Sequence, residues 1–232
     1  MTDSLFGSDE EDSRSDAGHD GDYVHEEPPL SIDGLTIFRN FISYEQEKDF
    51  FDWLEEAAYF AESEGDGKRK EDGRPDQLMF FGFESGFPEP LKVLSKNLCK
   101  KLEESSFDRT DLAFDQAIIN LYSPNDGLHD HIDLVHRFDN LVIVLSIGSG
   151  IGMRFSKEGR EYETFELYLP RRSLLCLKDE ARYDWKHGIA ARDEDIVMIS
   201  SGLAVFPRSL RLSLTLRKML PGADNLVVMD GL

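Results

Sequence analysis

Two segments in the first half of the chain have apolar residues at the spacing of an amphipathic helix. The first, SYEQEKDFFDWLEEAAYF, begins at Ser43, and Gln46 three residues later completes a capping-box pattern. Its expected apolar face consists of Phe50, Phe51, Leu54, Ala57 and Ala58. In the second, EPLKVLSKNLCKKLEE, leucines recur at positions 91, 94, 98 and 102. We therefore expect two helices, with short extended stretches in GLTIFRNF and LMFFGF.

From about residue 113 the pattern changes to short runs typical of β-strands. These runs are FDQAIINLY, LVIVLSIG, IGMRFS, ETFELYL, SLLCLK, DIVMIS and LRLSLTLRK. Turn-forming sequences such as SPNDG, GSG, KEG and LPRR separate them. Many short strands at close spacing predict a β-sandwich, jelly roll or barrel. The expected fold class is therefore α+β and mainly β, with the helices ahead of the β-rich half.

Length and charge divide the chain into one domain with two tails. A chain of 232 residues that is 40% hydrophobic fits one well-packed domain. Residues 1–27 hold ten acidic residues and one arginine, and such a segment repels itself and has little to bury. We expect a disordered acidic tail over 1–28, a domain over 29–220 and a short tail over 221–232. Within the domain, 29–112 is expected to be helical and 113–220 to be the β-rich core.

Composition also excludes several classes of protein. Two cysteines, Cys99 and Cys176, are too few for a disulfide framework or a cysteine-ligated zinc site. No apolar run approaches the ~20 residues of a membrane span, and the acidic start does not resemble a signal peptide. We expect a monomeric intracellular protein of the nucleus or cytoplasm, with no membrane partner. The net charge of −20 argues against strong non-specific binding to a polyanion, and it suits a basic protein partner such as a histone.

Candidate chemistry is concentrated in HDHID, residues 129–133. If this stretch is extended, His129, His131 and Asp133 point to the same face. Two histidines and one carboxylate on one side of a metal are the ligands that suit a redox-active iron. Of the six histidines, His187 alone lies in the β-rich half away from this cluster, so it is the natural third ligand. On the residues alone, a pairing of His129 with His131 and a loop-capping role for His187 both stay open.

The stretch RLSLTLR near the C-terminus alternates strictly between leucine and polar residues. Its polar face carries Arg211, Ser213, Thr215 and Arg217. One interpretation is an edge strand whose polar face is solvated. The other is an inward face that binds a dicarboxylate, because arginine holds carboxylates in bidentate fashion. Asn120 and Tyr122 share a face in IINLY and can hydrogen-bond the same anion.

Together these motifs resemble the AlkB family of Fe(II)/2-oxoglutarate-dependent dioxygenases. The family has N-x-Y, then H-x-D, then a distant histidine, then R-x5-R, and the resemblance covers roughly residues 34–218. The matching residues are Asn120 and Tyr122, His131 and Asp133, His187, and Arg211 and Arg217. The resemblance implies a double-stranded β-helix (jelly-roll) core and Fe(II) held by His131, Asp133 and His187. It also implies that 2-oxoglutarate and O2 are consumed.

The resemblance further implies how 2-oxoglutarate is bound. Its distal carboxylate pairs with Arg211, aided by Asn120 and Tyr122, while Arg217 holds the C1 carboxylate. Ser213 also belongs to this 2-oxoglutarate site, and it stands where the direct-reversal repair enzymes more often have asparagine. The sequences LPRRSLLCLKDEARYDWKHGI and RLSLTLR resemble the eukaryotic branch that contains the tRNA wobble-uridine hydroxylase.

The segment FFGF, residues 80–83, resembles the nucleotide-recognition lid of the family. Basic residues precede it in GKRKEDGR, and basic and aromatic side chains together can steer phosphates and stack a base. The candidate substrate contacts are Arg69, Lys70, Phe81, Phe83, Val135, His136 and Arg154. We expect hydroxylation or demethylation of a modified or alkylated base in nucleic acid, with RNA ahead of DNA. The alternative is a protein-directed oxygenase or demethylase that acts on a histone-like partner.

Overall fold

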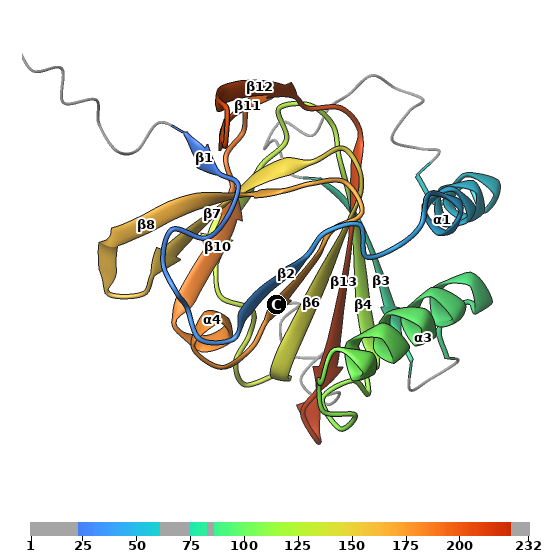
Figure 1. Ribbon diagram of the computed structural model, residues 1–232. Coiled ribbons are helices and arrows are strands. Elements are labelled where there is room, and N and C mark those ends of the chain that lie inside the picture. The colour runs from blue at the N-terminus through green and yellow to red at the C-terminus, as the bar shows by residue number, and fades with distance from the viewer. Residues whose placement is uncertain (1–22, 61–74, 83–85, 224–232) are drawn as a thin grey trace, which may run out of the picture.

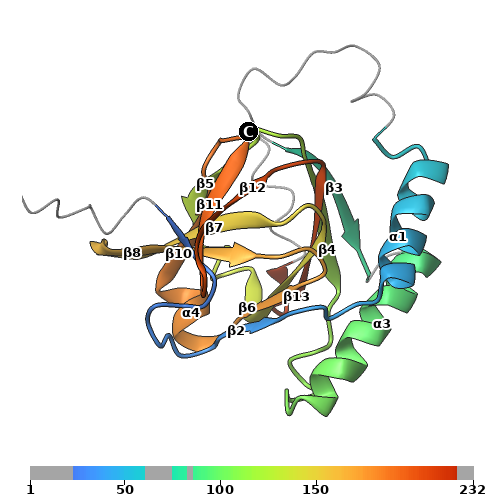
Figure 2. The same ribbon diagram turned by 45° about the horizontal axis from the view of Figure 1, so that its top comes forward.

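Two β-sheets face each other across a hydrophobic core, and two helices cover the outer face of one sheet (Figures 1 and 2). The computed structural model describes residues 23–60, 75–82 and 86–223. Buried aliphatic and aromatic side chains from both sheets form the core between them. This arrangement confirms the expected fold class, which is mainly β with a jelly-roll-like core.

The seven-stranded sheet contains, in spatial order, β12 (Gly202–Pro207), β11 (Glu194–Ile199), β1 (Val24–His25), β8 (Arg160–Leu169), β7 (Ile151–Lys157), β10 (Trp185–Ile189) and β5 (Leu128–His131). The six-stranded sheet contains β2 (Leu35–Phe38), β9 (Leu174–Leu177), β6 (Phe138–Gly148), β13 (Arg211–Met219), β4 (Gln116–Tyr122) and β3 (Asp76–Phe81). The helices are α1 (Tyr44–Glu56), α3 (Glu89–Glu104) and the short α4 (Asp179–Tyr183). No helix in the described ranges is long and apolar enough to cross a membrane.

The strand β13 lies in the middle of the six-stranded sheet, paired with β4 on one side and β6 on the other. The interpretation of RLSLTLR as a solvated edge strand is therefore wrong. Its three leucines are buried with residues of α1 and α3 in one hydrophobic cluster. Because successive side chains of a strand point to opposite faces, the two arginines point between the sheets. Arg211 lies opposite Tyr122, and Ser213 lies opposite Asn120.

The helix α1 begins as its sequence predicts. The Ser43 hydroxyl accepts a hydrogen bond from Gln46 N at 3.2 Å, and the Gln46 side chain accepts one from Ser43 N at 3.0 Å. Phe50 and Leu54 are buried, whereas the two alanines expected on the same face follow the end of the helix and are exposed. Glu47, in contrast, is fully buried and accepts hydrogen bonds from the Arg171 side chain and the Gly148 main chain. In α3 all four leucines are buried, as expected.

The described domain extends beyond the boundaries expected from charge. Val24 is 1% exposed, and β1 pairs in parallel with both β11 and β8. The expectation of disorder is therefore wrong for these residues, while residues 1–22 lie outside the described part of the chain. The apolar run here is too short to stand out in an acidic sequence, and its partners lie more than 140 residues away. At the other end, Ala223 is buried against Phe138 and Met219.

A truncation tests the contribution of β1. From the sequence alone, a chain that begins near Pro28 is expected to fold and to turn over as the full chain does. From the structure, we expect it to melt about 3–12 °C lower than a chain that begins at Tyr23. Burying a valine contributes about 1.5–3 kcal/mol, and each 1 kcal/mol shifts the melting temperature by about 2–4 °C at this size. Thermal unfolding of the two forms decides it, and equal melting temperatures would show that β1 adds nothing to stability.

Candidate active site

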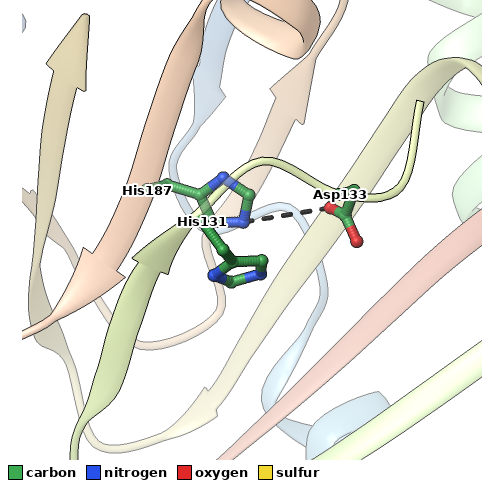
Figure 3. A group of neighbouring side chains, drawn as sticks. All are labelled: His131, Asp133 and His187. Carbon is green, nitrogen blue, oxygen red and sulfur yellow. Dashed lines mark ion pairs between the residues drawn. The ribbon is translucent and has the colours of Figure 1, made fainter. Parts of the chain in front are cut away.

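Two histidines and an aspartate, His131, Asp133 and His187, lie close together (Figure 3). His131 ends β5, Asp133 follows two residues later, and His187 lies opposite His131 on β10. One potential ligand atom from each residue lies within 4.8 Å of the other two, and Nε2 of His187 is 3.9 Å from Oδ2 of Asp133. Such a group can hold a metal ion.

A β-bulge in β5 separates His131 from His129. His187 pairs with His131, whereas Ile189, two residues on, pairs with Leu128, so β5 contains one extra residue. The bulge interrupts the alternation of side chains, and His129 is exposed instead of sharing the face of His131. The pairing of His129 with His131 is therefore not the arrangement that the fold produces. The His129 carbonyl lies 2.9 Å from Nδ1 of His131 and can accept a hydrogen bond from it. This contact favours the tautomer with the proton on Nδ1, which leaves Nε2 free to bind a metal.

Burial and neighbouring charges set the ionisation of the other two residues. Burial lowers the pKa of His187 to about 4 against the attraction of Asp133, so the ring is neutral at neutral pH. Metal binding requires this neutral form. Burial alone would raise the pKa of Asp133, but nearby positive charge, that of Arg217 first, outweighs the effect of burial. Asp133 therefore has a pKa below its usual value and is a carboxylate.

Arg217 connects the metal group to the other sheet. Its Nη1 donates to Oδ1 of Asp133, its Nε donates to the Gln116 side chain at 2.8 Å, and its guanidinium lies 3.9 Å from the centre of the Phe138 ring. The guanidinium is almost fully buried, with 8% of the side chain exposed. These contacts place Arg217 at the metal end of the cavity.

The cavity itself contains every residue that the resemblance assigned to iron or 2-oxoglutarate. Besides the metal group, its walls include Asn120, Tyr122, Arg211, Ser213 and Arg217. Burial raises the pKa of Tyr122 despite the nearby charge of Arg211, so its hydroxyl stays protonated and can donate. The polar face of β13 therefore lines one wall, and the metal group lines another.

Arg211 has hydrogen-bonding capacity that the described residues do not use. It is 1% exposed, and its Nη2 donates to the Ser146 hydroxyl at 2.9 Å. Its Nε and Nη1 are buried without an acceptor. A buried guanidinium with unpaired donors is costly unless an anion joins it. The cavity therefore fits a ligand with a carboxylate at the Arg211 end and metal-binding oxygens at the other end.

Arg154 lies outside the cavity, and its expected contact with substrate stays a prediction. It is opposite Gly188 on β10, whereas its neighbour Phe155 is opposite His187 and is buried. Because side chains alternate, Arg154 is on the outer face of the sheet, where it forms an ion pair with Asp130 at 2.8 Å. A Cβ at Gly188 would lie 2.1 Å from Oδ1 of Asp130. Glycine is therefore required at this position of β10, beside the ion pair between Arg154 and Asp130.

The other expected substrate residues that the structure describes do not line the cavity. Val135 and His136 are exposed on the loop that follows Asp133, and neither lines the cavity wall. Phe81 belongs to a small hydrophobic cluster at the end of β3. The candidates Arg69, Lys70 and Phe83 lie outside the described residues.

Three polar residues in or beside the site were not expected from the sequence: Gln77, Gln116 and Arg182. Gln116 shares the even spacing of Asn120 and Tyr122 on β4, so extending the alternation upstream would have found it. Gln77, which lies on β3, donates a hydrogen bond of 2.8 Å to the Asn120 side chain. Arg182 donates to the Asp133 carbonyl at 2.8 Å, but a single arginine within DEARYDW is typical of an exposed turn.

A family model of the 2OG-Fe(II) oxygenase superfamily matches residues 83–217, more than half of the chain. The mouse tRNA (carboxymethyluridine(34)-5-O)-methyltransferase ALKBH8 is 32% identical over 213 residues, which cover 80% of this chain. The chain belongs to the AlkB family of these oxygenases. An uncharacterised mimivirus protein, L905, is 30% identical and aligns over 85% of this chain and 91% of its own length. A Caenorhabditis elegans DNA N6-methyl adenine demethylase is 28% identical over 172 residues, 70% of this chain.

The chain spans only part of two of these relatives, 30% of the mouse protein and 56% of the nematode protein. Among solved structures, that of OsALKBH1 matches with a TM-score of 0.51 at 16% identity. The match covers 82% of this chain and 99% of that one, and it shows a shared fold. Family and site together make this AlkB-family protein an iron- and 2-oxoglutarate-dependent dioxygenase, which uses O2. The predicted enzyme class and cofactors are confirmed.

Substitution of the histidines tests the choice of ligands. We expect His131→Ala to abolish iron-dependent turnover of 2-oxoglutarate and to weaken Mn(II) binding strongly, because a metal ligand is lost. Asp133→Ala should abolish the same turnover. His129→Ala should retain most of the turnover and most of the Mn(II) affinity, because the bulge leaves the His129 side chain exposed and away from the face of His131. Succinate formation and Mn(II) titration measure the two effects. If the His129 variant is as inactive as the His131 variant while still folded, the assignment is wrong.

Proposed function

We propose that this AlkB-family oxygenase oxidises a modified or alkylated base in nucleic acid, with RNA ahead of DNA. The observation that carries the oxidation chemistry is the metal-binding group in one cavity with the unpaired donors of Arg211. The nucleic-acid substrate is supported by the names of two relatives, a tRNA-modifying enzyme and a DNA demethylase. The preference for RNA rests on the resemblance of LPRRSLLCLKDEARYDWKHGI to the branch that contains the tRNA hydroxylase.

In this proposal the chain supplies binding and orientation. His131, Asp133 and His187 would hold Fe(II), and the family chemistry then oxidises a substrate C–H bond while 2-oxoglutarate becomes succinate and CO2. Arg211 would pair with the distal carboxylate, with Asn120, Tyr122 and Ser213 beside it. Arg217 would hold the C1 carboxylate, and its contact with Asp133 supports this role. A hydroxylated carbon attached to nitrogen would leave as formaldehyde, which gives demethylation.

A second candidate is oxidation of a basic protein such as a histone. The observation in its favour is the net charge of −20, which attracts a cationic partner and repels a polyanion over long distances. The same cavity and co-substrate would serve either reaction. The two candidates therefore differ only in the surface that receives the substrate.

The two arginines of β13 should have separable effects. Arg211→Ala leaves the distal carboxylate without its buried partner, which costs ~3–5 kcal/mol, so 2-oxoglutarate affinity should fall by roughly two to three decades. Iron binding should survive, because Arg211 does not touch the metal group. Arg217→Ala should slow turnover with a smaller change in affinity. Titration of the Fe(II)–2-oxoglutarate absorption band measures this, and unchanged affinity in Arg211→Ala would remove Arg211 from the proposed co-substrate site.

The substrate is tested with matched sets of oligonucleotides and peptides. The full chain with Fe(II) and 2-oxoglutarate would be incubated with modified RNA, modified DNA and methylated histone-tail peptides, and the products identified by mass spectrometry. Asp133→Ala serves as the inactive control. We expect product on nucleic acid, formed faster on RNA. Faster turnover of DNA would reverse the order of preference, and product on the peptides alone would favour the second candidate.

A further inference from the structure

Arg182 is a buried arginine whose side chain donates only to main-chain carbonyls in the described residues. It lies on α4, is 2% exposed and is among the largest fully buried side chains there. Its Nη1 donates to the Asp133 carbonyl at 2.8 Å. Its Nη2 lies 3.4 Å from the carbonyls of both Leu134 and Phe138. Asp133 and Leu134 lie in the loop after β5, and Phe138 is the first residue of β6, so one guanidinium contacts this connection near both of its ends.

The helix that carries Arg182 is itself fixed to the core. The Asn140 side chain, on β6, accepts from Asp179 N at 3.0 Å and donates to the Asp179 carboxylate at 2.7 Å. Ala181 is 1% exposed, and its N–H donates to the Asp33 carbonyl at 3.0 Å. The chain then runs directly from α4 into β10, where His187 lies five residues after Arg182. The segment formed by α4 and β10 therefore positions His187 and also binds the main chain of Asp133.

Burying a guanidinium between α4 and the loop after Asp133 costs free energy. Removing a cation from water costs several kcal/mol, and a well-packed apolar side chain of similar volume is often as stable or more stable. The planar fork of arginine, however, can reach several carbonyls in fixed directions at the same time, which neither an apolar side chain nor lysine can do. The geometry therefore matches a task of fixing the positions of these carbonyls.

We propose that Arg182 is a positioning residue for the metal centre, which fixes the main chain at Asp133 relative to His187 and so sets the spacing of these two ligands. The inference rests on the proposed role of these residues as iron ligands. Groups that orient metal ligands without touching the metal typically contribute 10–100-fold to metal affinity. Arg182 acts through the ligand main chain, whereas Arg217 acts through the ligand carboxylate.

The test compares metal affinity with stability in matched variants. Mn(II) is used as the probe, and its dissociation constant and the melting temperature are measured for the full chain, Arg182→Gln and Arg182→Lys. The control is Arg208→Gln, because Arg208 is also buried, at 7% exposure, and donates to Asp195 and to the Ala190 carbonyl away from the metal group. The anaerobic Fe(II)–2-oxoglutarate absorption band provides a spectroscopic signature of ligand geometry.

We expect Arg182→Gln to weaken Mn(II) binding by 10-fold or more at temperatures where it is folded, as estimated for groups that orient ligands. Arg182→Lys keeps the charge but not the fork, and should bind Mn(II) with intermediate affinity and shift the absorption band. Arg208→Gln should lower the melting temperature and leave Mn(II) affinity within about 2-fold of the parent, because it does not touch a ligand-bearing loop.

Two outcomes would overturn the inference. One is unchanged Mn(II) affinity in folded Arg182→Gln, which would make Arg182 a residue of general stability. If that variant does not fold, unchanged affinity and band position in Arg182→Lys would have the same meaning. Failure of the proposed function gives a different result, because a parent chain that binds neither Mn(II) nor Fe(II) removes the metal site itself. A parent that binds metal but acts on no nucleic acid removes only the proposed substrate.

Discussion

The strand β13 has both faces buried, and this constraint organises the rest of the molecule. On one face its leucines join α1 and α3 in a hydrophobic cluster, which fixes the helices to the sheet. On the other face two arginines must remain charged between the sheets, where water is scarce. Burial of such charges is tolerated only with acceptors close at hand. The cavity is therefore a consequence of β13 as much as of the metal group, because its arginines define which ligands can enter.

The charges around the cavity are not balanced by the protein alone. Arg182, Arg211 and Arg217 are all buried there, while Asp133 is the buried carboxylate that faces them among the described lining and loop residues. Asp133 pairs with Arg217, and Arg211 keeps two unpaired donors. In the proposed binding mode, a dianionic co-substrate would supply the missing negative charge at both ends of the cavity. The same buried arginines thus favour binding of the co-substrate and lower the stability of the protein when the cavity is empty.

The sequence predicted those parts of the site that depend on local alternation. The helices followed from leucine spacing and a capping box, which need only the positions of residues within one element. The alternation in β13 left a solvated edge strand and an inward face both open, and elimination made His187 the natural third ligand with a loop-capping role still open. The family resemblance then implied the inward face and the role of His187.

The parts that sequence could not predict depend on pairing between distant segments. The exposure of His129 comes from a bulge that exists only when β5 pairs with β10. The outward position of Arg154 depends on its register opposite Gly188, and the burial of Val24 depends on strands far along the chain. Arg182 is a similar case, because its acceptors lie about 50 residues earlier in the chain.

The metal group and the co-substrate arginines belong to strands with very different mechanical support. β5 is four residues long, contains a bulge and lies at the end of its sheet, whereas β13 is hydrogen-bonded along both sides. Local opening of a protein begins where few neighbours hold the main chain. Local opening is therefore expected to reach β5, and with it the pairing of His131 with His187, before it reaches β13.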